Sequence, residues 1–325
     1  MSSDSKPPVV VLAGPTASGK TALALQLAES LGGEIVNADS MQVYRRLDVG
    51  TAKPSAEERA RVPHHLLDVV EPDEQYSAGR YAHEARAAVA AISSRGRVPF
   101  VVGGTGLYIR AFIEGLPAPV GRDEEIRARL ESEHAEAVRA GNPLLLHRRL
   151  AQLDPAAGRH IHPNDLRRTM RALELHALTG KLPSEVRSEH KPDRPYRVLF
   201  LVLDPGRDAL VRHIDMRCSQ MLERGLLQEV RDLRELGYGP QLPSMQAIGY
   251  RHMEPVIRGH ETLVNVLAQM QHDTRQFARR QRTWFRAVAE AEWVEPAEAD
   301  AIMARAEKFL AAGPAPGQPD TQEPV

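Results

Sequence analysis

The sequence predicts an α/β protein in which helices cover both faces of a parallel sheet and an all-helical segment interrupts the chain. Short, continuously apolar runs alternate with longer helical patterns, and these runs lack the polar alternation of a half-exposed strand. Strand-like runs then vanish between about residues 116 and 195, where charged helical stretches replace them. At 325 residues the chain is long enough for about two domains.

The expected elements follow the chain in order. The apolar runs at 8–13, 34–38, 98–102 and 198–203 predict strands, and the segments 19–30 and 77–94 predict helices between them. The charged middle segment predicts helices at 123–139, 144–153 and 165–178, and the chain after residue 204 is expected to be almost wholly helical. We therefore expect a core formed by 1–116 and 195–312, a helical insertion at 117–194, and a disordered tail at 313–325.

Composition excludes several classes of protein. Hydrophobic residues make up 42% and charged residues 26% of the chain, with 42 basic against 43 acidic side chains, which is typical of a globular protein. The longest apolar runs are too short to cross a membrane, and the first eight residues lack an apolar signal segment. The single cysteine, Cys218, excludes a disulfide framework. We expect a cytoplasmic protein without membrane association.

A phosphate-binding motif lies between the first predicted strand and helix. Its eight residues follow the pattern G-x-x-x-x-G-K-[ST] and are Gly14, Pro15, Thr16, Ala17, Ser18, Gly19, Lys20 and Thr21. In this context backbone N–H groups surround a phosphate, Lys20 supplies a positive charge, and the Thr21 hydroxyl can bind Mg²⁺. The motif predicts a P-loop NTPase-like core that binds a diphosphate or triphosphate, and does not by itself distinguish between them.

Two further segments end predicted strands at the same edge of the sheet. Asp39 follows the second apolar run, where ligands bind in open parallel sheets; the alternative is an N-cap of a helix starting near Ser40. The segment 103–106 (Gly-Gly-Thr-Gly) follows the third run, where its glycines would permit close backbone approach to a ligand and Thr105 offers a hydroxyl.

Basic residues cluster in two places despite the nearly neutral total. One cluster is Arg159, His160, His162, Arg167, Arg168 and Arg171, and the other is Arg275, Arg279, Arg280, Arg282 and Arg286. Such local density favours binding to nucleic-acid phosphates, and the alternative is a solvated, salt-bridged helix face.

Nine motifs in order resemble the bacterial tRNA dimethylallyltransferases. They are GPTASGKT at 14–21, NADSMQVY at 37–44, DVGTAKP at 48–54, PHHLLDVVEP at 63–72, YSAGRY at 76–81, VVGGTGLY at 101–108, HPNDLRRTMRALE at 162–174, AIGYR at 247–251 and TRQFARRQRTWFR at 274–286. Together they reach from residue 8 to about 295, which is essentially the whole expected fold.

The resemblance implies transfer of a dimethylallyl group from dimethylallyl diphosphate to N6 of adenine 37, beside the tRNA anticodon. It assigns the diphosphate to the phosphate loop, with Lys20, Mg²⁺ at Thr21, and Arg217 as a further contact. Asp39 is the expected base for the adenine amine, and Thr105 would contact the reacting groups. We expect a monomer.

The resemblance also implies that the anticodon stem-loop of tRNA is held by many residues while the target base is flipped out. These residues are Asp39, Ser40, Met41, Gln42, Thr105, Arg127, Arg167, Arg168, Thr169, Met170, Arg171, Gln246, Ala247, Ile248, Gly249, Tyr250, Arg251, Arg275, Arg279 and Arg280.

Three other activities share parts of this pattern. A small-molecule P-loop kinase would use ATP and would have no need of the arginine-rich C-terminal segment. An adenylate dimethylallyltransferase would perform the same chemistry on free AMP, ADP or ATP, so the RNA-holding segments would be superfluous. A non-catalytic RNA-binding NTPase would have no reason to combine Asp39 with Thr105 beside the phosphate loop.

Overall fold

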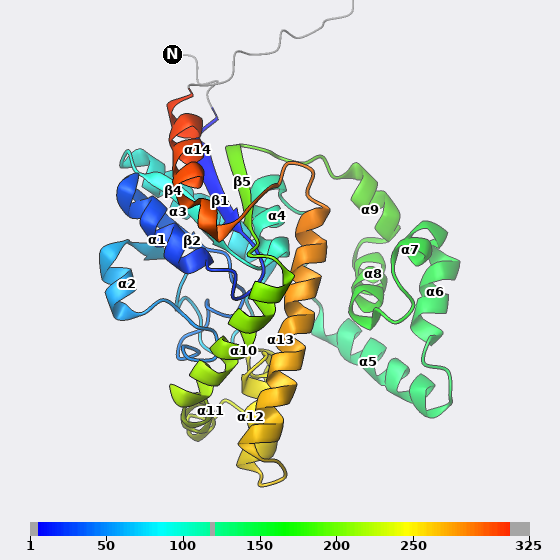
Figure 1. The fold of residues 1–325 in the computed structure, drawn as a ribbon. Helices are drawn as coiled ribbons and strands as arrows, with labels where there is room; N and C mark the ends of the chain where they lie inside the picture. The colour runs from blue at the N-terminus through cyan, green and yellow to red at the C-terminus, as the bar shows by residue number, and fades with distance from the viewer. Residues whose placement is uncertain (1–5, 118–120, 313–325) are drawn as a thin grey trace, which may run out of the picture. The chain divides into compact units, whose positions relative to one another are not determined.

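The computed structural model describes residues 6–117 and 121–312, and this part of the chain forms two units. One unit combines Met1–Ile113 with Arg194–Val325, and the other is Glu114–Asp193. The first unit contains a six-stranded parallel sheet with the order β3-β2-β4-β1-β5-β6 (Figure 1). Its strands are β1 (Pro8–Ala13), β2 (Gly33–Asn37), β3 (His64–His65), β4 (Val98–Gly103), β5 (Arg197–Leu203) and β6 (Glu292–Val294).

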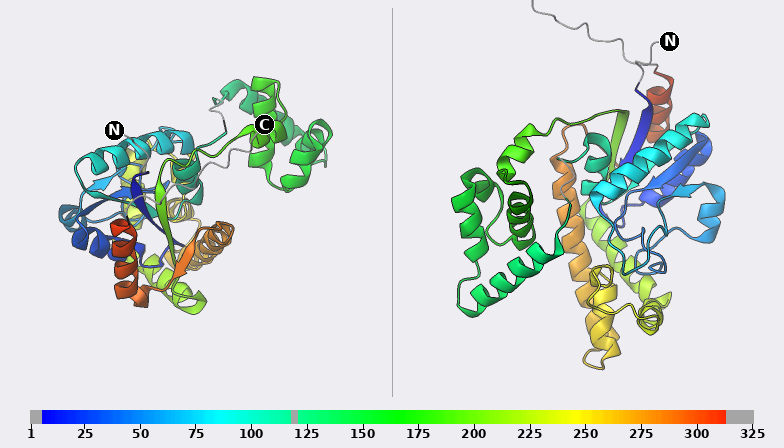
Figure 2. Two further views of the ribbon diagram at one scale, coloured as in Figure 1. Left: turned by 90° about the horizontal axis from the view of Figure 1, so that it is seen from above. Right: turned by 180° about the vertical axis from the view of Figure 1, so that it is seen from behind.

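Helices cover both faces of this sheet, as the continuous apolar runs of its central strands β1, β4 and β5 require (Figures 1 and 2). Because side chains alternate along a strand, Val10 and Leu12 of β1 pack with α1 and α14 on one face. Val9 and Val11 pack on the other face with α3, α4 and Phe285 of α13. The bounds of the helices are α1 (Lys20–Ser30), α2 (Ala56–Arg61), α3 (Ala78–Ser94), α4 (Gly106–Glu114), α13 (Leu263–Arg286) and α14 (Ala299–Ala311), with a 3₁₀ turn at Pro296–Glu298.

A helical group follows β5 and forms a second core of the same unit. It consists of α10 (Arg207–Glu223), α11 (Leu226–Glu235), a 3₁₀ turn (Ser244–Gln246), α12 (Tyr250–Ile257) and α13. These helices pack around Tyr250, Met253 and Met270 together with the loop that follows β2. The Glu229 carboxylate of α11 holds that loop by accepting hydrogen bonds from the backbone N–H groups of residues 48–50. Helix α13 therefore belongs to both the sheet core and this helical core.

The second unit is entirely helical in the part that the structure describes. Its helices are α5 (Glu124–Arg139), α6 (Leu145–Leu153), α7 (Pro155–His160), α8 (Leu166–Thr179) and α9 (Pro183–Glu189). They pack around Leu130, Leu146 and Leu150. The buried Glu174 carboxylate of α8 joins α5 to α8: Arg127 donates two hydrogen bonds of 2.8 Å to it, and Arg171 donates one of 2.7 Å.

We expect Glu174→Gln to destabilise this unit. Burial opposes the charge of Glu174, but the hydrogen bonds from Arg127 and Arg171 outweigh it and lower its pKa to about 2. The carboxylate therefore stabilises the fold at neutral pH, and this contribution is lost as the pH falls from about 4.5 toward 2. Removing the charge leaves two arginines without their buried partner, which costs on the order of 3 kcal/mol. Circular dichroism during thermal unfolding measures this. Glu189→Gln, at an exposed ion pair, should change little, and equal transitions for both variants would contradict the prediction.

The predicted fold class, a parallel sheet flanked by helices with a helical insertion, is confirmed. Each of the four strands predicted from apolar runs is present, within one residue of its expected bounds. The short strands β3 and β6 were not predicted, and β6 is a strand within the segment expected to be helical. The expected insertion, 117–194, overlaps the second unit, whereas the expected disordered tail at 313–325 lies outside the described residues.

Candidate active site

The phosphate loop connects β1 to α1 as the motif predicts. Gly14 has a φ of 149°, and a Cβ atom there would collide with the carbonyl oxygen of Leu203 on the neighbouring strand, so this position requires glycine. Gly19 has a φ of 91° and precedes the first residue of α1. The Lys20 ammonium lies across the loop, where it donates a 2.6 Å hydrogen bond to the Pro15 carbonyl. The loop is therefore folded, with its backbone at the positive end of a helix.

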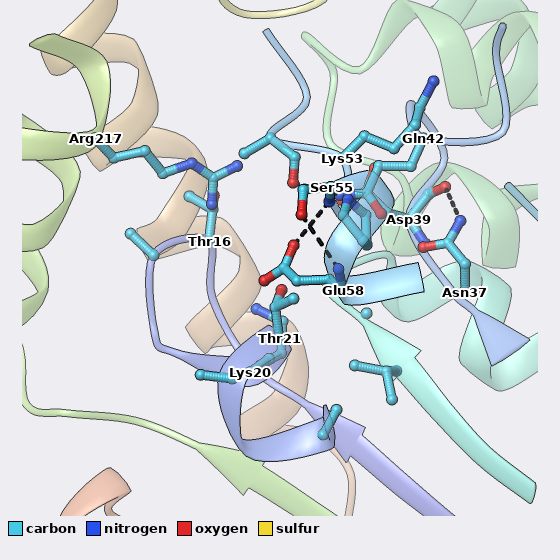
Figure 3. A pocket seen from close by; sticks show the side chains of 18 of the residues that line it. Thr16, Lys20, Thr21, Asn37, Asp39, Gln42, Lys53, Ser55, Glu58 and Arg217 are labelled. Atoms are coloured by element: carbon cyan, nitrogen blue, oxygen red, sulfur yellow. Dashed lines mark hydrogen bonds between the residues drawn. The ribbon is translucent and has the colours of Figure 1, made fainter. Parts of the chain in front are cut away.

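A cavity of about 780 Å³ opens at the carboxyl ends of β1, β2 and β4. The phosphate loop from Thr16 to Thr21 forms one wall, Asp39 comes from the end of β2, and Arg217 comes from α10. Figure 3 shows Lys20 and Thr21 at the base of this cavity, with Arg217 and Asp39 reaching in from opposite sides. The structure thus brings together four residues that the sequence places up to about 200 positions apart.

The cavity concentrates positive charge around the phosphate loop. Burial lowers the pKa of Lys20 from 10.5 to about 7; the nearby Arg217 guanidinium acts in the same direction, and the Asp39 carboxylate opposes it. Arg217 donates a 3.3 Å hydrogen bond to the Thr51 carbonyl, which orients the guanidinium toward the cavity (Figure 3). A multiply charged anion between Lys20 and Arg217 would stabilise both cations, so the site fits a diphosphate.

Asp39 does not cap a helix. The segment after β2 forms turns, and the Asp39 carboxylate accepts a 2.8 Å hydrogen bond from the N–H of Met41, two residues on. Asn37 supports this turn by accepting from the Asp39 N–H and donating to the Asp39 carbonyl. The alternative, an N-cap of a helix starting near Ser40, is therefore excluded, and the turn directs the carboxyl group into the cavity.

Thr105 supports the Asp39 turn and does not line the cavity itself. Its N–H donates to the Ala38 carbonyl and its hydroxyl oxygen accepts a 3.0 Å hydrogen bond from the Ser40 N–H. The glycines around it have a further structural role. Side chains at Gly104 and Gly106 would collide with Gln281 and Trp284 of α13, so these glycines allow close approach of that helix. Gly103 and Gly104 also line the cavity.

The donor set at the loop fits Mg²⁺ only in combination with a bound phosphate group. Among the described residues no group of three His, Cys, Asp or Glu side chains could hold a metal ion. Thr21 is exposed at the cavity, where its hydroxyl can supply one oxygen ligand. Since Mg²⁺ commonly combines one or two protein ligands with phosphate oxygens and water, this arrangement fits it.

Apart from Asp39 and Thr105, the residues expected to hold tRNA fall into four groups. The exposed group consists of Arg167, Arg168, Gln246, Arg279 and Arg280. The half-buried group consists of Ser40, Met41, Gln42, Ala247 and Ile248. Four arginines form ion pairs: Arg127 and Arg171 with Glu174, Arg251 with Asp273, and Arg275 with Asp215. The fourth group is buried, so its side chains pack within their own unit; it consists of Thr169, Met170, Gly249 and Tyr250.

Among the cavity residues that the sequence analysis did not single out are Lys53 and Gln281, although both lie in quoted motifs. Lys53 is held by Tyr44, Asp48 and Asp68, and Gln281 contacts both the phosphate loop and Gly104. In the sequence, the motif at 274–286 stands out for its arginines. A glutamine between two arginines in a predicted amphipathic helix was the signal available, because its position faces the buried side.

Comparison with known proteins gives consistent matches over the whole fold. The family model described as IPP transferase matches residues 42–288, and that described as Isopentenyl transferase matches residues 7–69. A protein of Anaeromyxobacter dehalogenans named tRNA dimethylallyltransferase is 51% identical over 303 residues, covering 92% of this chain and 99% of its own length. One of Geobacter sulfurreducens with the same name is 48% identical, covering 94% and 98%.

Solved structures show the same similarity. The tRNA isopentenylpyrophosphate transferase of Bacillus halodurans is 37% identical, with a TM-score of 0.69 and coverage of 94% of this chain and 97% of its own. A eukaryotic dimethylallyltransferase acting on tRNA is 30% identical, with a TM-score of 0.79 and coverage of 94% and 80%.

Proposed function

The chain belongs to the IPP transferase family, and on this premise we propose that it transfers a dimethylallyl group from dimethylallyl diphosphate to N6 of adenine 37 beside the tRNA anticodon, releasing diphosphate. It is therefore a tRNA-modifying prenyltransferase. The observation that carries the chemical assignment is the shared cavity, which places a carboxylate, Asp39, opposite a phosphate loop.

The phosphate-loop side of the cavity supports departure of the diphosphate. As the allylic C–O bond breaks, its electron pair moves to the diphosphate oxygen, and negative charge grows there. Backbone N–H groups of the loop, Lys20 and Arg217 are positioned to stabilise that charge. Mg²⁺ held by the Thr21 hydroxyl would add to this stabilisation when bound.

The Asp39 side of the cavity supports attack by the amine. The lone pair of an adenine N6 amine is delocalised into the ring, so the amine is a weak nucleophile. Asp39 would accept one proton as the new C–N bond forms, which restores a neutral secondary amine. Thr105 keeps the Asp39 turn in place through Ser40 and Ala38.

The exposed basic residues of α13 and α8 support an RNA acceptor over a free nucleotide. A nucleotide acceptor needs only the cavity, whereas Arg279, Arg280, Arg167 and Arg168 lie on exposed helix surface outside it. We infer that they contact the phosphates of the anticodon stem-loop while the target base is flipped into the cavity.

None of the described helices is long and apolar enough to span a bilayer. A cytoplasmic monomer remains our proposal.

We expect Arg279→Ala to weaken binding of an anticodon stem-loop and to reduce the salt dependence of that binding. Each phosphate contact releases a counterion, so the affinity falls as salt rises. Losing one contact should make the negative slope of log K against log salt less steep by about 0.7 to 1. Fluorescence anisotropy at several salt concentrations measures this slope. Arg97→Ala is the matched control. Arg97 directly precedes β4, so it lies at the amino ends of the strands, whereas the cavity lies at their carboxyl ends. A slope equal to that of the wild type would show that Arg279 faces solvent.

The proposed function is tested by offering labelled dimethylallyl diphosphate and Mg²⁺ to an unmodified anticodon stem-loop and to AMP in parallel. Label in the RNA, lost when adenine 37 is replaced, is the expected result. Label in AMP alone would support the adenylate dimethylallyltransferase instead. No label in either acceptor, with hydrolysis or transfer of ATP phosphate, would overturn the proposal in favour of a kinase or an RNA-binding NTPase.

A further inference from the structure

Gln281 joins three segments that are far apart in the chain. Its side-chain oxygen accepts a 2.9 Å hydrogen bond from the N–H of Thr16 in the phosphate loop. Its side-chain nitrogen donates a 2.9 Å hydrogen bond to the carbonyl of Gly104, the residue before Thr105. Gln281 is only 7% exposed. One amide of α13 therefore connects the loop that holds the diphosphate to the segment that supports Asp39.

The chemistry of this contact specifies glutamine. The Thr16 N–H can only donate and the Gly104 carbonyl can only accept, so the two partners fix which end of the amide faces each of them. A carboxylate would accept from Thr16 but would oppose the Gly104 carbonyl with a second acceptor. An apolar side chain of similar length would satisfy neither group. The absence of a side chain at Gly104 makes the contact possible, because a Cβ atom there would collide with the Gln281 nitrogen.

The helix that carries Gln281 is fixed by the residues that directly follow it. Arg282 forms a 2.8 Å ion pair with Asp204 at the end of β5. Trp284 packs against Gly106, and Phe285 is fully buried in the sheet core. The position of the Gln281 amide is thus set by the core rather than by either loop.

We propose that Gln281 is a positioning residue that sets the separation between the bound diphosphate and Asp39. The inference rests on the proposed function, since it assigns the two sides of the cavity to donor and acceptor. Gln281 lines the cavity, but both polar atoms of its amide are already engaged, one with Thr16 on the donor side and the other with Gly104 on the acceptor side. We therefore assign it to holding these two segments rather than to contact with a reactant. Alignment of two reactants is sensitive to displacement, and a shift of about 1 Å can lower the rate ~10²-fold.

The test separates positioning from diphosphate binding. Gln281→Met removes both hydrogen bonds at similar volume, and we expect kcat for transfer to an anticodon stem-loop to fall ~10- to 100-fold. The dissociation constant for inorganic diphosphate, measured by calorimetry, should stay within about threefold, because Lys20, Arg217 and the remaining loop N–H groups are unchanged. Gln276→Met on the exposed side of the same helix is the matched control and should leave both quantities unchanged.

Three results would overturn the proposal. One is a kcat within twofold of the wild type in Gln281→Met. Another is a loss confined to diphosphate affinity and KM, which would make Gln281 part of the binding site. The third is an equal loss in Gln276→Met.

If Gln281→Met does not fold, Gln281→Glu serves instead, because it retains the volume and the contact with the Thr16 N–H. The same fall in kcat is expected for this variant, because the contact with the Gly104 carbonyl is lost. A wild-type protein that transfers no label would instead refute the proposed function.

Discussion

Asp39→Asn is expected to lower the turnover of dimethylallyl transfer by ~10²-fold or more while leaving binding of the anticodon stem-loop nearly unchanged. An asparagine retains a side-chain oxygen that can accept the hydrogen bond from the Met41 N–H, so the turn after β2 should persist. It cannot take a proton from the adenine amine at neutral pH. The substitution therefore removes the base and keeps the local backbone, which alanine at this position would not do.

The measurement is single-turnover transfer of labelled dimethylallyl groups to saturating stem-loop, which isolates the chemical step from RNA binding. Asp48→Asn is a suitable control because Asp48 lines the same cavity but pairs with Lys53 on its outer side. Asp39→Ala should be at least as slow as Asp39→Asn, with an additional loss from the broken turn. Turnover of Asp39→Asn near that of the wild type would mean that another group, or water, accepts the proton.

The sheet could be predicted from sequence wherever burial leaves a continuous apolar run. Strands β1 and β5 are covered on both faces, so residues 8–13 and 198–203 are apolar without interruption. Strand β6 is three residues long at the edge of the sheet, and its first residue is Glu292, so no such run exists. The two histidines of β3 form a strand because β2 offers an unpaired edge, which is a property of the tertiary fold.

The candidate site could be predicted in its phosphate half, because a local motif encodes a local structure. The acceptor half depends on contacts that no local pattern contains. Arg275 and Arg279 lie four residues apart in the same predicted helix, yet only Arg275 meets an acidic partner, Asp215, 60 positions away. Similarly, Gln281 acquires its importance from Thr16 and Gly104, which lie more than 170 positions earlier in the chain.

Lys20→Ala is expected to weaken binding of inorganic diphosphate and to lower turnover by ~10²-fold or more, since it removes a charge at the leaving group. The wild-type affinity should also depend on pH in a way that the variant does not. Burial and Arg217 lower the pKa of Lys20 to about 7 in the free protein, so part of the population is neutral near pH 7. A bound diphosphate favours the charged form and raises that pKa, so binding above pH 7 requires uptake of a proton.

This linkage gives the sign of the effect. As the pH rises above about 7, the wild-type affinity for diphosphate should fall relative to that of Lys20→Ala, approaching tenfold per pH unit while the bound form stays protonated. Comparing the two proteins removes the ionisation of diphosphate itself, which is common to both. Lys308→Ala, at an exposed position of α14, should follow the wild type throughout. Parallel pH profiles for the wild type and Lys20→Ala would show that Lys20 is already fully charged before the ligand binds.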